Sequence, residues 1–522
     1  MKKNFLVLYF WTFSIFVSFS LAAQQVVNEK GRVTIDYLSD SSAAIYYREA
    51  KANGFLLREG IPQNFNQLQL GYNYGNGKFV PAQGSTKSQQ QYLHTEGKTV
   101  LSGIQLWGSF QLDKTREDST HFGHQTRNNT TTPYYFASPA YNSYRRNIYT
   151  LNALGEKYLL KDNLPFILGA DYRIGSHYSV NDPRAQINDF QFNLNSGLGY
   201  KIFHKILIGA NFMHGYGQER FNIGYKNSTY YESTLYPEYN NYIMNGYAEP
   251  IPKLENRKYQ TNRTRNGIDI TFKYILDSIN SLVIVGGTQK EKQRSEYISD
   301  VSIDTLSEYD ITNKIIGVLW MHAGTNSHFI ANLKYINIAG KDRNYTYNGL
   351  NNYIYNSAEW NASLSYSIRK KMNILNAVLH ITKKENERVD GSFSNKIRYE
   401  NWRIQPSIGM FTKMDNKHTW GLDLSPYIGF GTSGNILKIS SSSNGLFTNG
   451  LIYHDYLFNT ASYWGCKLSG NYTIAYTNGV QVGIKCFVGY TAYTKLKDIG
   501  ISTAQLPGKS RWNTGLSLCF YF

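Results

Sequence analysis

The chain has few of the features that define other common protein classes. It holds 3 cysteines and 12 prolines in 522 residues, too few cysteines for a disulfide framework. After the first 23 residues no run of 18 apolar residues occurs, which excludes a helical membrane span. No linker and no low-complexity tract divides the chain. These absences argue against a disulfide-rich secreted domain, a helical membrane protein and a multidomain chain.

Sequence patterns of catalysis, metal binding and nucleic-acid binding are equally scarce. The 11 histidines are scattered, and no Gly-x-Ser-x-Gly sequence is present, so we expect no enzyme. His121 and His124 could offer two imidazoles to a metal, but no cysteine is near, so we expect no metal and no cofactor. The net charge of +17 is spread along the chain. We expect contacts with lipid headgroups and no nucleic-acid partner.

Tyrosine and glycine are abundant instead, with 44 of each, and the final residues alternate. From Trp512 to Phe522, apolar side chains fall on every second position, as in a strand that crosses a bilayer. The stretch resembles the closing strand of a Gram-negative outer-membrane β-barrel, in which such residues are the assembly signal. Here the matching residues are Leu516, Leu518, Phe520 and Phe522. A buried terminal strand of a soluble sandwich is the alternative.

The beginning of the chain predicts export. Lys2 and Lys3 precede an apolar run and a small-residue cleavage site, so residues 1–23 are expected to be a signal peptide. Residues 24–63 form an N-terminal segment with a short helix within Ser41 to Leu57, placed in the periplasm or folded into the lumen as a plug. Residues 64–522 are expected to form the barrel.

The alternation pattern predicts an all-β fold, a transmembrane antiparallel barrel of about 18 strands, with 16 the next choice. The expected strands are 65–74, 88–95, 99–112, 145–154, 166–174, 190–200, 206–214, 268–274, 282–287, 315–322, 329–339, 355–368, 375–381, 402–410, 420–430, 464–476, 480–492 and 512–522.

The connections between these strands alternate in length. Short turns such as 413–417 and 323–327 alternate with long loops such as 383–399 and 289–312, which fits periplasmic turns and extracellular loops. Glu96-Gly97-Lys98 is expected to be a further turn. On this count more residues lie in loops than in the wall.

A turn at Thr477-Asn478-Gly479 fixes the register of one hairpin. It places Cys486 opposite Gly470 and Cys466 opposite Tyr490, so these two cysteines face lipid without facing each other. Cys519 is expected on the other face of its strand. All three are interpreted as packing residues.

Three stretches carry a family resemblance: Leu70 to Gly77, Thr95 to Lys98, and Gly169 to Gly175 followed by Asn181-Asp182-Pro183-Arg184. Together they resemble an uncharacterised outer-membrane barrel family of Bacteroidota, domain of unknown function 6850. The resemblance implies fold and localisation. It implies no activity and no functional residues.

The strand phase also predicts which charged side chains face the lumen. They are Asp171, Arg173, Asp269, Lys273, Lys334, Glu359, Arg403, Asp423, Lys467 and Lys485. One interpretation is a lining that mildly favours anions. The other is a ladder of ion pairs and hydrogen bonds that braces the wall.

The expected loop from Gly215 to Arg265 is rich in tyrosine. Candidate binding residues are Tyr225, Tyr230, Tyr231, Tyr236, Tyr239 and Tyr242. Such rings could hold a ligand or partner, or they could pack on one another.

The sequence therefore favours an outer-membrane barrel of a Gram-negative bacterium that acts as a channel or transport component for a small solute. The alternative is a plugged barrel that binds a surface ligand or partner through its long loops. Expected partners are outer-membrane lipids, the barrel assembly machinery and a surface or periplasmic protein.

Overall fold

The computed structural model describes residues 35, 37–160, 162–247, 250–252, 258–298, 302–347, 349–415, 417–432, 434–440, 445–476 and 479–522. The expected signal peptide lies outside these residues, as do residues 24–34 and the turn residues Thr477 and Asn478. No helix in the described ranges is both long and apolar enough to cross a membrane.

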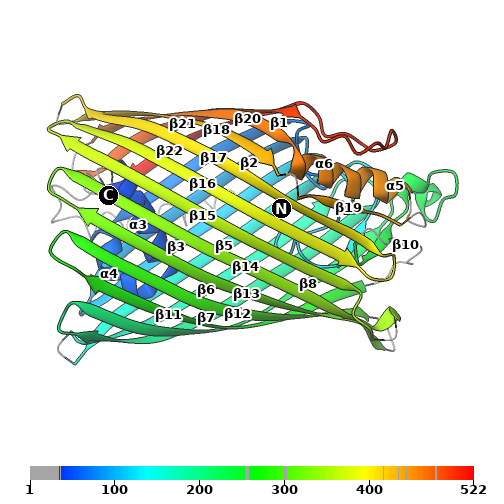
Figure 1. Ribbon diagram of the computed structural model, residues 1–522, viewed down its shortest axis with the longest axis horizontal. Coiled ribbons are helices and arrows are strands. Elements are labelled where there is room, and N and C mark those ends of the chain that lie inside the picture. The colour runs from blue at the N-terminus through cyan, green and yellow to red at the C-terminus, as the bar shows by residue number, and fades with distance from the viewer. Residues whose placement is uncertain are drawn as a thin grey trace, which may run out of the picture.

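Within the described residues, eighteen antiparallel strands form one closed barrel, shown in Figure 1. Closure is made by β1, which pairs with β2 on one side and with β22 on the other. The predicted all-β fold and strand number are confirmed. The wall strands are β1 (Asn66–Gly77), β2 (Lys87–Leu101), β3 (Ile104–Thr120), β5 (Asn142–Leu159), β6 (Leu164–Ser179), β7 (Arg184–Ile202), β8 (Ile206–Gly224), β11 (Lys258–Ile275), β12 (Asn280–Ile298), β13 (Ile303–Ala323), β14 (Ser327–Asn344), β15 (Tyr353–Lys370), β16 (Asn373–Asp390), β17 (Asn395–Lys413), β18 (His418–Gly431), β20 (Ser462–Ala475), β21 (Gln481–Lys495) and β22 (Ser510–Tyr521).

Alternation along each strand separates a lipid face from a lumen face. On β15, Leu364 and Tyr366 are exposed on the outside, whereas Ser365 and Ser367 are buried on the inside. This alternation of apolar and small polar residues is typical of a barrel strand with one face in contact with lipid and the other with polar groups. The same alternation on the other strands produces the apolar outer band of a membrane barrel.

An aromatic row marks the outer edge of this band. Tyr335, Trp360, Trp402 and Phe430 lie on this row, in register across β14 to β18, with Lys383 of β16 between the two tryptophans. Aromatic rings of this kind collect at the membrane interface. The row therefore places the outer membrane boundary near Trp402.

From that row outward, the lipid-side face of the strands becomes charged. Lys383 pairs with Glu400 at 3.3 Å, and Lys396 pairs with Glu387 at 2.6 Å. The strands continue past the membrane, so the predicted loop 383–399 is wrong and shrinks to residues 391–394. The predicted loop 289–312 is wrong in the same way, because β12 continues to Ile298 and β13 begins at Ile303. The expectation that loops outweigh the wall was wrong because it counted these outer strand ends as loop.

The expected turn at Glu96-Gly97-Lys98 is also wrong. Strand β2 runs on to Leu101, and the turn follows at Ser102 and Gly103, both with positive φ. The register of the hairpin between β20 and β21 is confirmed, with Cys466 opposite Tyr490 and Cys486 opposite Gly470.

An N-terminal helical segment lies inside the end of the barrel that carries the short turns (Figure 1). It comprises α3 (Ser41–Ala52), η1 (Gly54–Leu56) and α4 (Leu57–Gly60). We call residues 35 and 37–61 the plug. Its buried side chains, such as Ile45 and Leu57, pack against inward Trp107 and Leu319 of the wall.

Loop segments fold into the opposite end. A small sheet of β4 (Tyr134–Ala137), β9 (Tyr242–Asn245) and β10 (Pro250–Pro252) stands in this mouth. Beside it lie α5 (Gly445–Phe447), η5 (Thr448–Tyr453) and α6 (His454–Thr460). We call these six elements the lid. The remaining short elements are η2 (Ser228–Tyr230), η3 (Pro237–Tyr239), η4 (Tyr345–Tyr347) and β19 (Ile436–Lys438).

Strands β4 and β9 of the lid sheet are buried on both faces. Phe136 and Ile243 pack toward Phe221 and neighbouring inward residues on one wall. Tyr242 and Met244, the alternate positions of β9, pack toward the opposite wall and the helices of the lid. Because successive side chains of β9 point to opposite faces, this four-residue strand contacts two sides of the barrel.

Candidate functional site in the lumen

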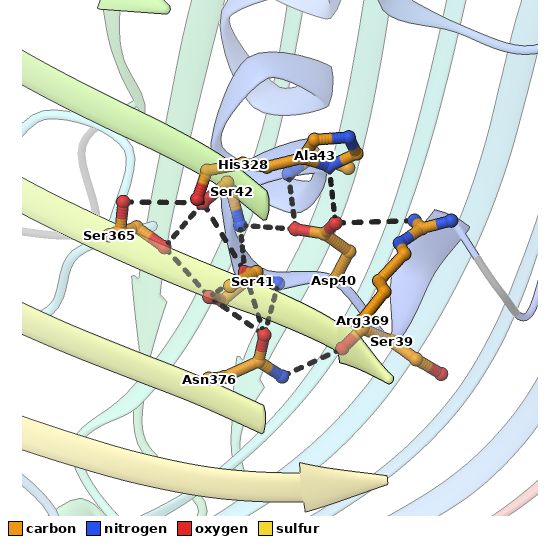
Figure 2. Close-up of polar contacts among 10 residues, drawn as sticks. Ser39, Asp40, Ser41, Ser42, Ala43, His328, Ser365, Arg369 and Asn376 are labelled. Carbon is orange, nitrogen blue, oxygen red and sulfur yellow. Dashed lines mark hydrogen bonds and ion pairs between the residues drawn. The ribbon is translucent and has the colours of Figure 1, made fainter. Parts of the chain in front are cut away.

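The first helix of the plug, α3, begins at a buried carboxylate. Asp40 caps α3 by accepting hydrogen bonds from the backbone N–H groups of Ser42 (2.9 Å) and Ala43 (3.1 Å), as Figure 2 shows. His328 donates to the other carboxylate oxygen at 2.6 Å, and Arg369 donates at 3.2 Å. The helix terminus is therefore tied to two wall strands, β14 and β15.

Asp40 is held as an anion despite its burial. Burial is the largest single influence and acts to raise the pKa, but the hydrogen bond and charge of His328 and the N–H of Ala43 outweigh it. The pKa of Asp40 is lowered to about 2. A carboxylate with cationic and N–H partners keeps its charge in a low-dielectric site.

A cluster of small polar groups continues this contact. The hydroxyl of Ser41 lies 2.7 Å from that of Ser365, and the hydroxyl of Ser42 lies 3.0 Å from the same atom. Asn376 donates from Nδ2 to the carbonyl of Ser39 at 2.8 Å (Figure 2). We call Ser39 to Ser42 with their wall partners the latch. It is polar throughout.

The other end of the plug is fixed on the facing side of the wall. Lys98 of β2 donates from Nζ to the carbonyl of Leu57 at 2.8 Å and also to that of Ile61. The neighbouring Glu96 accepts from Trp107 Nε1 at 2.8 Å and from the Tyr47 hydroxyl. The two charged residues that were expected in a turn hold the plug instead.

The ten predicted lumen residues all lie on strand faces opposite the lipid, but their surroundings differ. Arg173 pairs with Asp189, and Lys273 pairs with Glu59 of the plug. Asp171 accepts from Asn195 at 3.1 Å. These contacts resemble the bracing ladder that was the second interpretation of the charged lining.

The paired residues belong to a larger network along β3 to β12. His177 lies 2.9 Å from Asp189, Arg146 lies 2.9 Å from Glu117, and Arg263 pairs with Glu219. Apart from Arg173, no residue of this network was singled out from the sequence, because cross-strand pairing depends on register.

The other predicted residues line open space or pack on rings. Asp423, Lys467 and Lys485 share one cavity of about 370 Å³ beside the plug. Asp269 and Lys334 share another of about 140 Å³ near Asn53 and Leu56. Two more make local contacts: Glu359 accepts from Asn361 at 2.8 Å, and the guanidinium of Arg403 lies 4.2 Å from the centre of the Tyr427 ring.

The tyrosines proposed for binding contact one another. Tyr230 stacks on Tyr239 with ring centres 4.1 Å apart, and Tyr225 donates to the carbonyl of Tyr239 at 3.0 Å. Tyr236 packs edge-on against Tyr230, and Tyr231 against Tyr225. Tyr242 is buried in the lid. The outer tip nevertheless leaves Tyr231 and Tyr236 partly exposed.

The two loop histidines are buried in separate contacts. His124 bonds through Nδ1 to the hydroxyl of Tyr144, and His121 packs on Tyr141 with ring centres 4.6 Å apart. No group of three or more metal-ligating side chains is found in the described residues. All three cysteines are free thiols, with Cys519 buried toward the lumen beside Ile35.

Sequence reasoning missed the latch, although signals for it exist. Asp40 directly before a helical stretch is a standard N-cap pattern. Ser363, Ser365 and Ser367 occupy three successive inward positions of β15. Such small polar positions are where a wall can receive another segment.

The fold, the apolar band and the filled lumen together define an outer-membrane type of β-barrel with a plug. A family model described as a family of unknown function, DUF6850, matches residues 55–522, and the chain belongs to this family.

No curated protein matches the chain. Among solved structures, the chain is similar to the copper transporter OprC, with 8% identity over 88% of this chain and 81% of that one, at a TM-score of 0.39. It is also similar to the FrpB iron transporter from Neisseria meningitidis (F3-3 variant), with 10% identity, 89% and 82% coverage and a TM-score of 0.39. A third is the import receptor Fiu from E. coli K12, with 8% identity, 88% and 82% coverage and a TM-score of 0.40.

Proposed function

We propose that the protein is a gated transport component for a small solute in the outer membrane of a Gram-negative bacterium, as its resemblance to a Bacteroidota family implied. It works by binding and passage, without covalent chemistry. The plug and the lid are its two closures. The route runs through the sector formed by β18, β20, β21, β22 and β1.

One observation carries this proposal. The plug does not fill the lumen evenly but leaves a cavity of about 370 Å³ along that sector, with Lys467, Lys485 and Asp423 in its lining. A barrel with a purely structural role gains nothing from leaving lysines around open space, because packing and pairing stabilise a wall better. A closed transport route requires such a space.

The latch gives the plug a way to release. Its contacts are hydrogen bonds and an ion pair, each of which can be exchanged for water with a net cost of about 0.5–3 kcal/mol. The apolar contacts of Leu57 and Ile61 near Lys98 are more expensive to break. We therefore expect the Asp40 end to leave the wall first.

The test is single-channel conductance of the refolded protein with the latch covalently closed. The hydroxyl oxygens of Ser42 and Ser365 lie 3.0 Å apart, close enough to try a disulfide between cysteines at these positions. The three native cysteines are first replaced by serine or alanine. The matched control joins Thr261 and Ser295, whose hydroxyls are 3.2 Å apart on the paired strands β11 and β12, outside the proposed route.

We expect brief openings in the cysteine-free parent. Oxidation of the S42C/S365C variant should abolish them, reduction should restore them, and the T261C/S295C control should behave like the parent. A large steady conductance that the latch disulfide leaves unchanged would contradict gating by the plug.

A receptor role for the outer loops is the second candidate. It is favoured by the exposed tip of the tyrosine loop, where Leu235 is 82% exposed beside Tyr236. Exposed apolar groups at a loop tip are common at binding surfaces. A barrel that inserts but never conducts, with or without the latch disulfide, would favour this candidate over transport.

A further inference from the structure

The cavity beside the plug has the size of a small-molecule site. Its volume is about 370 Å³, and it is bounded by residues of seven wall strands and by Ile35, Leu38 and Ser39 of the plug. Sites for small ligands are typically about 300–1,000 Å³ and combine apolar or aromatic walls with a few placed polar groups. The cavity has both kinds of group.

Its charge balance is positive. Lys467 and Lys485 both line it, and the contacts found for their ammonium groups in the described part of the chain are with the rings of Phe487 and Tyr521, not with carboxylates. The only acidic residue in the lining is Asp423, which accepts a hydrogen bond from Ser425 at 2.8 Å. Two ammonium groups against one carboxylate give the lining a net positive charge, which favours an anionic guest.

Flat aromatic rings form much of the remaining wall. A Cβ at Gly71 would collide with the ring of Tyr92, and a Cβ at Gly515 would collide with that of Phe487. Each ring therefore lies along the wall over a glycine of a neighbouring strand. Phe411 lies over Gly421 in the same way. All three rings line the cavity, which gives it broad apolar faces suited to a ring-shaped guest.

Hydrogen-bonding groups stand between the rings. The side-chain oxygen of Asn471 is buried and has no hydrogen-bond partner within the described part of the chain. Gln69 donates to the Tyr92 hydroxyl at 2.7 Å and to Ser517 at 3.0 Å, which fixes the tyrosine in place. An unsatisfied buried acceptor is costly, and a hydroxyl of a guest would satisfy it.

We propose that this cavity binds an acidic saccharide, with its carboxylate on Lys467 and Lys485 and its ring against Phe487 and the other aromatic faces. Lys467 already lies 4.6 Å from the centre of the Phe487 ring, so charge and stacking surface are adjacent. The proposal rests on the proposed function, because it names the class of solute that the route would take. It also places the guest against Leu38 and Ser39, next to the latch.

The test is isothermal titration of the refolded barrel in detergent with three probes: sodium glucuronate, glucose and sodium acetate. Glucuronate has both the ring and the charge, glucose lacks the charge, and acetate lacks the ring. We expect glucuronate to bind at least about tenfold more tightly than either, since a charge-assisted hydrogen bond and a stacked ring each add about a factor of ten.

The variants separate the two contributions. K467Q and K485Q should each weaken glucuronate at least about tenfold and leave glucose nearly unchanged, whereas F487L should weaken both sugars. K467R should retain most of the affinity. The matched control is K334Q, which removes a lumen lysine that lines the other cavity. Circular dichroism and heat-dependent gel mobility show that each variant is folded.

Equal affinity for glucuronate and glucose, or an effect of K334Q as large as that of K467Q, would overturn the proposal. Absence of glucuronate binding, while the latch disulfide still controls conductance, would overturn the saccharide site and leave the transport function. Glucuronate binding with the expected variant pattern in a barrel that never conducts would support the site and count against transport.

Discussion

Asp40 and His328 are 288 residues apart in the chain, and yet the carboxylate of one lies 2.6 Å from Nδ1 of the other. The contact joins the first turn of the plug to a strand in the middle of the barrel sequence. The latch as a whole spans three wall strands, because His328, Ser365 and Asn376 lie on β14, β15 and β16.

Replacing Asp40 by asparagine should loosen the plug without unfolding the barrel. The amide can still cap α3, but the charge that faces His328 and Arg369 is lost, at a cost of about 1–3 kcal/mol. We expect more frequent openings in single-channel recordings and faster proteolysis within residues 37–53. The control is Asp162→Asn, which removes an exposed ion pair with Arg58 and should change little. Identical recordings for the two variants would contradict the role of Asp40.

Lys98→Met should destabilise the opposite end of the plug. The methionine fills similar space, but the carbonyls of Leu57 and Ile61 lose their donor in a buried site, at about 2–4 kcal/mol in total. Hydrogen exchange should rise in residues 54–61 and stay unchanged in β16. If exchange rises equally in both regions, Lys98 stabilises the wall as a whole.

Lowering the pH should open the loop that carries His121 and His124 before it destabilises the barrel wall. Burial, reinforced by the nearby charge of His454, lowers the pKa of His121 to about 4. Burial, with Arg146 adding to it, lowers that of His124 to about 3. An opened loop takes up protons below about pH 6.5 and the closed loop does not, so stability is lost as the pH falls from about 6.5 toward 4.

The measurement is protease sensitivity of residues 121–141 between pH 7 and 4, corrected for the protease's own pH profile. Each histidine contributes on the order of 2 kcal/mol to this dependence. His121→Gln with His124→Gln should flatten the profile. A double variant with the wild-type profile would assign the dependence to other groups.

Gly71→Ala should destabilise the barrel by about 1–3 kcal/mol, because the new methyl group meets the ring of Tyr92. Gly286→Ala is the matched control, since nothing lies within 4 Å of its Cβ position. The midpoint of urea unfolding in detergent compares the two. Tyr92→Ala added to Gly71→Ala should recover part of the loss if the collision is its cause.

The strands of the wall could be predicted from the sequence, whereas the contacts of the plug and the lid inside it could not, and both outcomes have physical reasons. Lipid imposes a strict alternation, so strand number, facing and the Gly470–Cys486 register could be read directly. Where the membrane ends at Trp402, that constraint ends too, and the predicted strands stopped there although β17 starts at Asn395. Predicted boundaries thus followed the bilayer and missed the outer strand ends.

Contact with lipid imposes no comparable pattern on the sequence of the plug and the lid. Lys98 was assigned to a turn because a charge beside glycine is common in turns, whereas its real partners are carbonyls 37 to 41 residues earlier in the chain. Predicting such a pair requires knowing which segment enters the lumen. Local sequence carries only the weaker hints of the Asp40 cap and the serines of β15.

The charged outer ends of the strands have a consequence for access. From Trp402 to Asn395, β17 extends roughly 23 Å along its own axis, at about 3.3 Å per residue, and rises somewhat less than this because barrel strands are tilted. The outer opening of the barrel therefore lies above the lipid headgroups, and its rim is formed by the outer strand ends with their ion pairs. A solute approaching from outside meets only the protein's own loops, and the surrounding lipid can change in composition without altering the entrance.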